Sequence, residues 1–219
     1  MKGNYKMIKN FNINKNSIQS GRSMIEMLGV LAIVGVLSVG GIAGYSKAME
    51  KFKINKTADQ VSQIVTNIRT LYAQQTTYAG LNNISAYNMG VLPDEMGTGT
   101  NLKNPFNGGI YISSGDVGPV TSNWGYDVTF DIIYDGLSKQ ACVTLATMDW
   151  GSTSSSGLLG LCISSNSGCR DMISLYVEMN SGGNGYGKHG VNHLPLSVAN
   201  AATECNCPNN DCSLGWKFY

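Results

Sequence analysis

Six cysteines and two histidines are the residues of this 219-residue chain whose types and spacing could do chemistry. An even number of cysteines in an exported domain predicts disulfide bonds. Zinc ligation is the alternative, because His189 and His193 stand four residues apart and precede Cys205, Cys207 and Cys212. The histidines lie in a glycine-rich stretch where helical pairing is not expected, so we expect disulfides and no metal. The six cysteines are Cys142, Cys162, Cys169, Cys205, Cys207 and Cys212.

Hydroxyl and carboxylate groups form no catalytic arrangement in the sequence. The serine run at residues 152–156 lacks the Gly-x-Ser-x-Gly pattern of a nucleophile, and Asp94, Glu95 and Asp149 are isolated acidic features. No glycine-rich phosphate-binding motif occurs. The net charge of +1 gives no electrostatic indication of a nucleic-acid partner. We therefore expect no enzyme activity and no cofactor.

The basic charge is concentrated at the N-terminus. Lys2, Lys6, Lys9 and Lys15 precede Gly21, and no acidic residue lies among them. Without these four lysines, the chain has 11 of its 15 basic side chains and all 14 acidic ones, which gives a net charge of −3. Residues 1–21 therefore read as a basic leader peptide.

A stretch of 20 uncharged residues at 27–46 follows that leader. About 20 apolar residues in a helix cross the hydrocarbon core of a bilayer. The lysines before the stretch predict that the N-terminus faces the cytoplasm, which places the chain after Lys47 on the other side. We interpret residues 22–46 as a transmembrane helix.

The leader, the polar junction and the apolar segment occur in an unusual order. A secretory signal is cleaved after its apolar region, which is then discarded. Here the polar leader ends at Gly21, and Arg22 and Glu26 come directly before the apolar stretch. This arrangement resembles the prepilin signature of type IV pilins and type II secretion pseudopilins, with glycine before the cut and glutamate at the fifth mature position.

The resemblance implies a processing and assembly route. An inner-membrane prepilin peptidase would cut between Gly21 and Arg22 and methylate the new α-amine. Arg22 departs from the phenylalanine or methionine usual at that position. A carboxylate in lipid costs about 2.5 to 3.5 kcal/mol by analogy with aspartate at a helix centre, so Glu26 requires a positive partner. In this family that partner is the N-terminal amine of a neighbouring subunit.

The helix is expected to continue beyond the membrane. Apolar residues recur at spacings of four and three through residues 54–72, and we expect Leu71 to widen the stripe. No proline or glycine interrupts residues 45–79, and Gly80 is a suitable stop. Residues 47–79 are therefore predicted as the amphipathic outer half of one long helix.

Residues 80–219 are predicted to form an extracytoplasmic head of α+β class. Turn residues predict a connecting loop over 80–108. Residues 109–113, 127–134, 171–179 and 214–219 are strand candidates, and residues 138–148 form a helix candidate with Ser138 as its cap. The implied pilin fold packs the long N-terminal helix on an antiparallel β-sheet, stabilised by disulfides.

Two head segments, residues 103–109 (KNPFNGG) and 135–142 (DGLSKQAC), resemble type IVb pilins. In that subgroup a cysteine in the second helix closes a disulfide to one near the C-terminus, which implies Cys142 with Cys205. Cys162 with Cys169 and Cys207 with Cys212 would follow as short loops. Six cysteines allow 15 connectivities in general.

The function that this resemblance implies is that of a structural prepilin subunit of a type IVb-like pilus. The subunit would start as a single-pass inner-membrane protein in contact with lipid and then polymerise with copies of itself into an extracellular fimbrium. Prepilin peptidase and an assembly ATPase with its platform protein would be partners. A minor pilin or a secretion pseudopilin is one alternative, and a membrane-anchored extracytoplasmic binding or enzymatic domain is another. Adhesion, DNA uptake, motility and conjugation all stay open.

Overall fold

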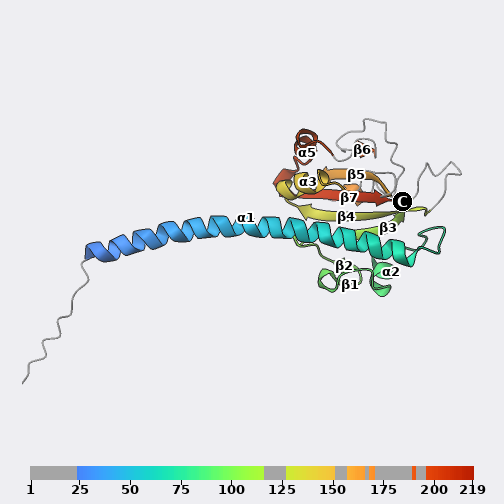
Figure 1. Ribbon diagram of the computed structural model, residues 1–219, viewed down its shortest axis with the longest axis horizontal. Coiled ribbons are helices and arrows are strands. Elements are labelled where there is room, and N and C mark those ends of the chain that lie inside the picture. The colour runs from blue at the N-terminus through green and yellow to red at the C-terminus, as the bar shows by residue number, and fades with distance from the viewer. Residues whose placement is uncertain (1–23, 116–126, 151–156, 166–167, 171–188, 191–195) are drawn as a thin grey trace, which may run out of the picture. The chain divides into compact units, whose positions relative to one another are not determined.

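The computed structural model describes residues 24–115, 127–150, 157–165, 168–170, 189–190 and 196–219. The chain divides into two compact units, Met1–Ser46 and Lys47–Tyr219. Helix α1 (Met24–Leu71) begins in the first unit, where its described side chains are all exposed. It continues into the second unit, the head (Figure 1).

Within the head, α1 buries one stripe of side chains against a β-sheet. The predicted spacing of four and three is confirmed, and the two polar residues Thr57 and Gln60 are buried with it. Leu71 is 50% exposed, so the prediction that it widens the apolar face is wrong. The buried apolar residues of α1 are Ile54, Val61, Ile64, Val65 and Ile68.

The long helix ends at Leu71, so the prediction that it continues to residue 79 is wrong. The next positions of the apolar stripe after Tyr72 fall within residues 74–77, which are all polar. The backbone instead turns, with the amide of Gln75 donating to the Tyr72 carbonyl at 2.8 Å. The turn brings the ring of Tyr78 to 5.2 Å from that of Tyr72 and 4.9 Å from that of Phe130 on the sheet. Aromatic packing therefore ends the helix without a glycine or proline.

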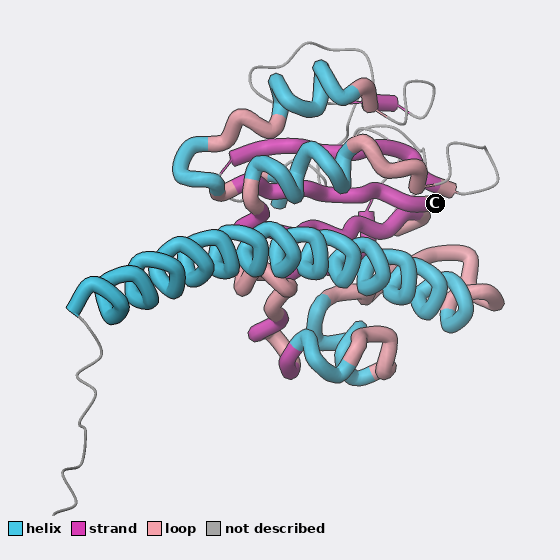
Figure 2. Tube along the Cα trace, turned by 60° about the vertical axis from the view of Figure 1, so that its left-hand side comes forward, coloured by secondary structure: helices cyan, strands magenta, loops and turns pink. Residues whose placement is uncertain are grey.

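The sheet has five antiparallel strands in the order β3-β4-β7-β5-β6. These are β3 (Ile110–Gly115), β4 (Thr129–Leu137), β5 (Leu158–Ser165), β6 (His189–Gly190) and β7 (Cys212–Phe218). β3, β4 and β7 confirm three of the predicted strands. β5 was not predicted, and the predicted strand at 171–179 lies outside the described residues. The C-terminal strand β7 lies between β4 and β5 in the middle of the sheet (Figure 2).

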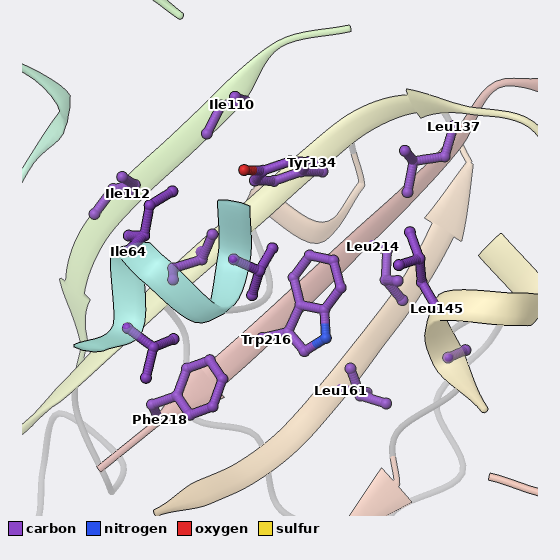
Figure 3. Close-up of a cluster of buried hydrophobic side chains, with 14 of the residues drawn as sticks. Ile64, Ile110, Ile112, Tyr134, Leu137, Leu145, Leu161, Leu214, Trp216 and Phe218 are labelled. Atoms are coloured by element: carbon purple, nitrogen blue, oxygen red, sulfur yellow. The ribbon is translucent and has the colours of Figure 1, made fainter. Parts of the chain in front are cut away.

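Strand alternation gives the sheet two different faces. Phe130, Ile132 and Tyr134 of β4 belong to the main core with α1, as do Trp216 and Phe218 of β7. Figure 3 shows Ile64 of α1 among the side chains of Ile112, Tyr134 and Trp216. We call this face the helix face and the opposite one the distal face. The class is α+β, with the long helix on an antiparallel sheet, as predicted.

Short helices complete the head. α3 (Lys139–Ala146) is capped by Ser138, whose Oγ accepts from the Ala141 amide at 3.1 Å, which confirms that predicted helix. α5 (Val198–Glu204) packs against α3, has its own serine cap at Ser197, and was not predicted. The 3₁₀ turn η3 (Pro208–Asn210) leads into β7.

The segment predicted as a loop over 80–108 contains regular structure, which corrects that prediction. α2 (Asn83–Asn88) starts at a capping box, in which Asn82 accepts from the amides of Ile84 and Ser85 while the Ser85 hydroxyl accepts from the Asn82 amide. The turn η1 (Asp94–Met96) and the two-residue strands β1 (Gly97–Thr98) and β2 (Asn101–Leu102) follow. Asn82 is a preferred N-cap residue, but Ser85 stands where the usual capping box has glutamate or glutamine, so only the first half of the signal was present in the sequence.

Candidate functional site

The first candidate site is the apolar part of α1. α1 is long and apolar enough to cross a membrane, and no other helix in the described part of the chain is. Large apolar side chains are exposed along it, for example Leu31 at 65% and Val36 at 75%. An exposed apolar surface of this length requires lipid or protein to cover it. The segment can therefore serve as an anchor or as an assembly surface.

Glu26 lies in the first turn of α1 and is exposed. It is therefore carried at the N-terminal end of the apolar segment, where backbone amides without helical partners favour a negative charge. Gly21 and Arg22, the predicted cleavage and methylation residues, lie outside the described residues. Within the described residues, the predicted assembly residue thus has no ion-pair partner from its own chain.

A hydrogen-bonded group ties the outer half of α1 to the head. The hydroxyl of Tyr134 on β4 lies 3.5 Å from Oε1 of Gln60 on α1, to which it donates. The side-chain amide of Gln60 donates to Glu95 at 3.3 Å, and the ammonium of Lys56 lies 3.5 Å from the same carboxylate oxygen. These four residues thus join helix α1, strand β4 and the turn η1 through hydrogen bonds and one ion pair.

The contacts in this group shift the pKa of two of its members. The hydrogen bond from Gln60 lowers the pKa of Glu95, and the charge of Lys56 acts in the same direction, while partial burial opposes them. Burial raises the pKa of Tyr134 well above its ordinary value, and the charge of Glu95 adds to the rise. Both shifts favour the forms that the hydrogen bonds require, which are an ionised Glu95 and a neutral Tyr134.

Two further contacts hold α1 against the head. The hydroxyl of Ser138, the cap of α3, donates to the carboxylate of Glu50. The side-chain amide of Asn67 donates to the Val91 carbonyl at 2.9 Å. Helix α1 is therefore fastened to the head near both ends of its outer half.

The disulfides form a framework that links α3, α5 and the sheet. Cys142 of α3 bonds to Cys205 at the end of α5, a sequence separation of 63 residues. Cys162 bonds to Cys169, and Cys207 bonds to Cys212, over separations of 7 and 5 residues. These are the pairings that the family resemblance implies. All six cysteines are used in this way, so Cys205, Cys207 and Cys212 are not thiolate ligands for zinc.

The part of the chain that the structure describes contains no cluster of side chains that would support the zinc alternative. No group of three or more histidine, cysteine, aspartate or glutamate side chains that could hold a metal ion occurs there. His193 lies outside the described residues. His189 belongs to β6, which pairs with β5 at Leu161.

The distal face carries two buried carboxylates that sequence reasoning missed. Asp135 accepts from the Nε of Arg170 at 2.9 Å and from the Ser213 hydroxyl at 2.6 Å. The guanidinium of Arg170 also lies over the Tyr111 ring, 3.4 Å from its centroid. A charged side chain on the buried side of a strand is stable only with such partners.

The second buried carboxylate pairs with the neighbouring strand. Asp131 is directly opposite Lys217 in the β4–β7 register, and its Oδ1 lies 3.3 Å from the lysine ammonium. In the sequence of β4, Asp131 and Asp135 stand at odd positions and the even positions 130, 132 and 134 are apolar. This alternation was the signal that a second face of the sheet carries charge. The distal face therefore combines these buried carboxylates with an apolar cluster of Ile133, Cys162 and Cys169, and is not an exposed sheet surface there.

Comparison with known proteins gives concordant matches for the head. A family model described as Bundlin matches residues 46–218. The major structural subunit of bundle-forming pilus from Escherichia coli O127:H6 (strain E2348/69 / EPEC) is 32% identical over 145 residues, 64% of this chain and 70% of that protein. Toxin coregulated pilin from Vibrio cholerae is 27% identical over 143 residues, 61% of this chain and 59% of that protein.

Two solved pilin structures also align with this chain. The crystal structure of TcpA, a type IV pilin from Vibrio cholerae El Tor biotype, aligns with a TM-score of 0.49 and 13% identity, covering 76% of this chain and 99% of that one. A type IV b pilin from Salmonella typhi aligns with a TM-score of 0.49 and 17% identity, covering 74% and 97%.

Proposed function

The chain belongs to the Bundlin family, and from that premise we propose that it is a structural subunit of a type IVb-like pilus that polymerises with copies of itself. The match of the family model over residues 46–218 carries this proposal, because it covers all of the head except Tyr219. Two of its relatives are named as a major structural subunit and as a pilin, which favours a major subunit over a minor pilin or pseudopilin. The extracellular fibre is then the place where it acts.

The apolar part of α1 fits the two stages of such a protein. Before assembly, the exposed apolar side chains of residues 27–46 would lie in the inner membrane, with the head outside the cytoplasm. In the fibre, the same side chains would be covered by the helices of other subunits. A segment that serves in both places must be apolar around its whole circumference, as this one is.

Processing is the second part of the proposal. Prepilin peptidase would cleave between Gly21 and Arg22, remove the basic leader and methylate the α-amine of Arg22. That new positive charge on a neighbouring subunit would pair with Glu26 and set the register of the incoming chain. An assembly ATPase and its platform protein would supply the energy, since no nucleotide motif is present in this sequence.

Mass spectrometry of the mature chain and one substitution test both parts. We expect an N-terminus at Arg22, and we expect Glu26→Gln to abolish incorporation into fibres while the protein accumulates in the membrane. Glu26→Asp is the matched control, since it retains the charge and should retain assembly in part. An N-terminus at Met1, or fibres that contain normal amounts of Glu26→Gln, would overturn the processing and assembly proposal.

A further inference from the structure

Two lysines and a phenylalanine on α1 are exposed at the start of the head unit. Lys47 and Lys51 are exposed, and so is Phe52, at 59%. We call these three residues the collar. Among the residues that the structure describes, neither of its lysines has an ion-pair or hydrogen-bond partner.

The charged neighbours of the collar are already engaged in the fold. The ammonium of Lys53 lies 5.6 Å from the centroid of the Phe106 ring, and Lys56 pairs with Glu95 at 3.5 Å. Glu50, which lies between the collar lysines in sequence, accepts from the Ser138 hydroxyl. Of the charged residues in this stretch, the collar lysines are therefore the ones available to bind a partner outside the head.

The position of the collar along α1 fits the layer of lipid headgroups. Ser46 is the last residue of the uncharged segment, and at 1.5 Å per residue Lys47 is about 1.5 Å beyond it, Lys51 about 7.5 Å and Phe52 about 9 Å. The headgroup layer on each side of a bilayer is roughly 5 to 7.5 Å thick, which is half the difference between the total thickness and the hydrocarbon core. Lys47 thus falls in that layer and Lys51 at its outer edge, while the backbone of Phe52 is about 1.5 Å beyond it.

Side-chain direction in a helix brings all three groups closer to the bilayer. Helical side chains lean toward the N-terminus of the helix, which here is the direction of the apolar segment. The Phe52 ring therefore leans back toward the lipid. Lysine stems lie along apolar surface and carry their ammonium groups to the phosphate level.

From this position and chemistry we propose that the collar binds the anionic phospholipid headgroups of the outer leaflet of the membrane that α1 spans. The inference depends on the membrane insertion in the proposed function. Contact with a phosphate would neutralise each lysine, and the ring would shield the contact from water. The collar would thereby hold the head at the membrane surface until the subunit is extracted, and extraction would break these contacts.

Quenching of a tryptophan in place of Phe52 tests the proposal. The full chain with Phe52→Trp is placed in nanodiscs of phosphatidylcholine alone or with a third of phosphatidylglycerol, each with a headgroup-proximal brominated lipid as quencher. The unsubstituted chain supplies the background of the three native tryptophans. We expect quenching of the new tryptophan at least twofold stronger in the anionic discs, and we expect Lys47→Gln with Lys51→Gln to reduce it to the value in phosphatidylcholine.

Lys103→Gln is the control, because Lys103 is exposed and lies on the head outside α1. This control should leave the quenching unchanged. Equal loss in the control, or a tryptophan that responds to aqueous acrylamide but not to brominated lipid, would overturn the inference. Shielding of the new tryptophan from acrylamide that rises with the number of chains per disc would also overturn the inference, because it would make a second copy of the chain the partner. A chain that fails to float with lipid contradicts the membrane insertion itself, so the two failures are distinguishable.

Discussion

At the residue scale, the head is held together by charges that sequence patterns assign to the solvent. Asp135 is a buried carboxylate on β4, and it is stable because Arg170 and Ser213 both donate to it. Arg170 directly follows Cys169, so the same short segment supplies a disulfide to β5 and a cation to β4. The segment at residues 169 and 170 is therefore fixed to the distal face at two points, by the disulfide and by the ion pair.

Replacing Arg170 tests this contact. Arg170→Met leaves the Asp135 charge with Ser213 as its remaining described partner, and should lower the free energy of unfolding by about 1.5 kcal/mol. This is the low end for bonds to charged groups, because the Arg170 side chain is 38% exposed. Arg170→Lys should have an intermediate effect, since lysine retains the charge but not the planar stack on Tyr111. Urea denaturation at pH 7 measures each value.

Asp135→Asn is the control background for that prediction. With the carboxylate removed, Arg170→Met should cost clearly less than it does in the native chain. An equal loss in both backgrounds would mean that Arg170 acts by packing on Tyr111 alone.

Glu95 gives the head a dependence on acid. The hydrogen bond from Gln60 lowers its pKa in the folded chain, so the unfolded chain binds the proton more tightly. Its contribution to stability is therefore complete above the unfolded pKa of about 4.3 and is lost as the pH falls through the folded pKa. Urea denaturation from pH 7 to pH 3 should show a smaller decline for Glu95→Gln than for the native chain. Glu95→Asp, which keeps a carboxylate, serves as the control, and identical slopes for Glu95→Gln and the native chain would contradict the prediction.

At the element scale, the helices are determined by their caps and by what they pack against. Ser138 accepts from the Ala141 amide and also donates to Glu50, whereas Ser197 caps α5 by accepting from the Asn200 amide at 3.2 Å. The cap of α3 therefore also fastens α1, and the cap of α5 is local.

The two serines make a matched pair for substitution. Ser197→Ala should lower the free energy of unfolding by about 1 kcal/mol, the usual cost of a lost N-cap. Ser138→Ala should cost more, by about a further 1 kcal/mol, because Glu50 also loses its hydrogen bond to Ser138. Thermal unfolding of both variants checks the order. Equal losses would show that the Glu50 contact contributes nothing to stability.

The same elements show how far the sequence could predict the fold. The stripe on α1, the Ser138 cap and the strand β4 each depend on neighbours in the chain, and all three were predicted from it. The end of α1 depends on Tyr78 meeting Phe130, which are 52 residues apart in sequence. β5 was missed because its run LLGLCISS has no alternation of apolar and polar residues. Both of its neighbours in the sheet also come later in the chain.

The candidate site divides in the same way. Glu26 and its distance from Gly21 are local in sequence, so the sequence alone supports the assembly hypothesis. The contact of Gln60 with Glu95 and Tyr134, and that of Asp135 with Arg170, join residues 35 or more positions apart. A polar residue in an apolar stripe, such as Gln60, indicates that a partner exists but does not identify it.

At the scale of the whole molecule, the three disulfides constrain the unfolded chain to different degrees. The Cys142–Cys205 bond closes a loop with a separation of 63 residues, while the other two bonds close loops with separations of 7 and 5. Loop-closure entropy grows with the logarithm of loop length. It gives about 4 kcal/mol for the long loop and about 2 kcal/mol for each short one.

Replacing each cysteine pair by serines should therefore separate the long bond from the short ones. The Cys142→Ser, Cys205→Ser chain should lose about twice as much free energy of unfolding as either of the other double variants. The Cys207→Ser, Cys212→Ser chain is the closest control. Cys207 and Cys212 flank the turn η3, and Cys207 lies two residues after Cys205. Denaturation of the oxidised heads in guanidinium gives the three values. If the long bond contributes no more than the short ones, its unfolded loop must already be compact, and the function of that bond is to hold α3 against α5 in the native head.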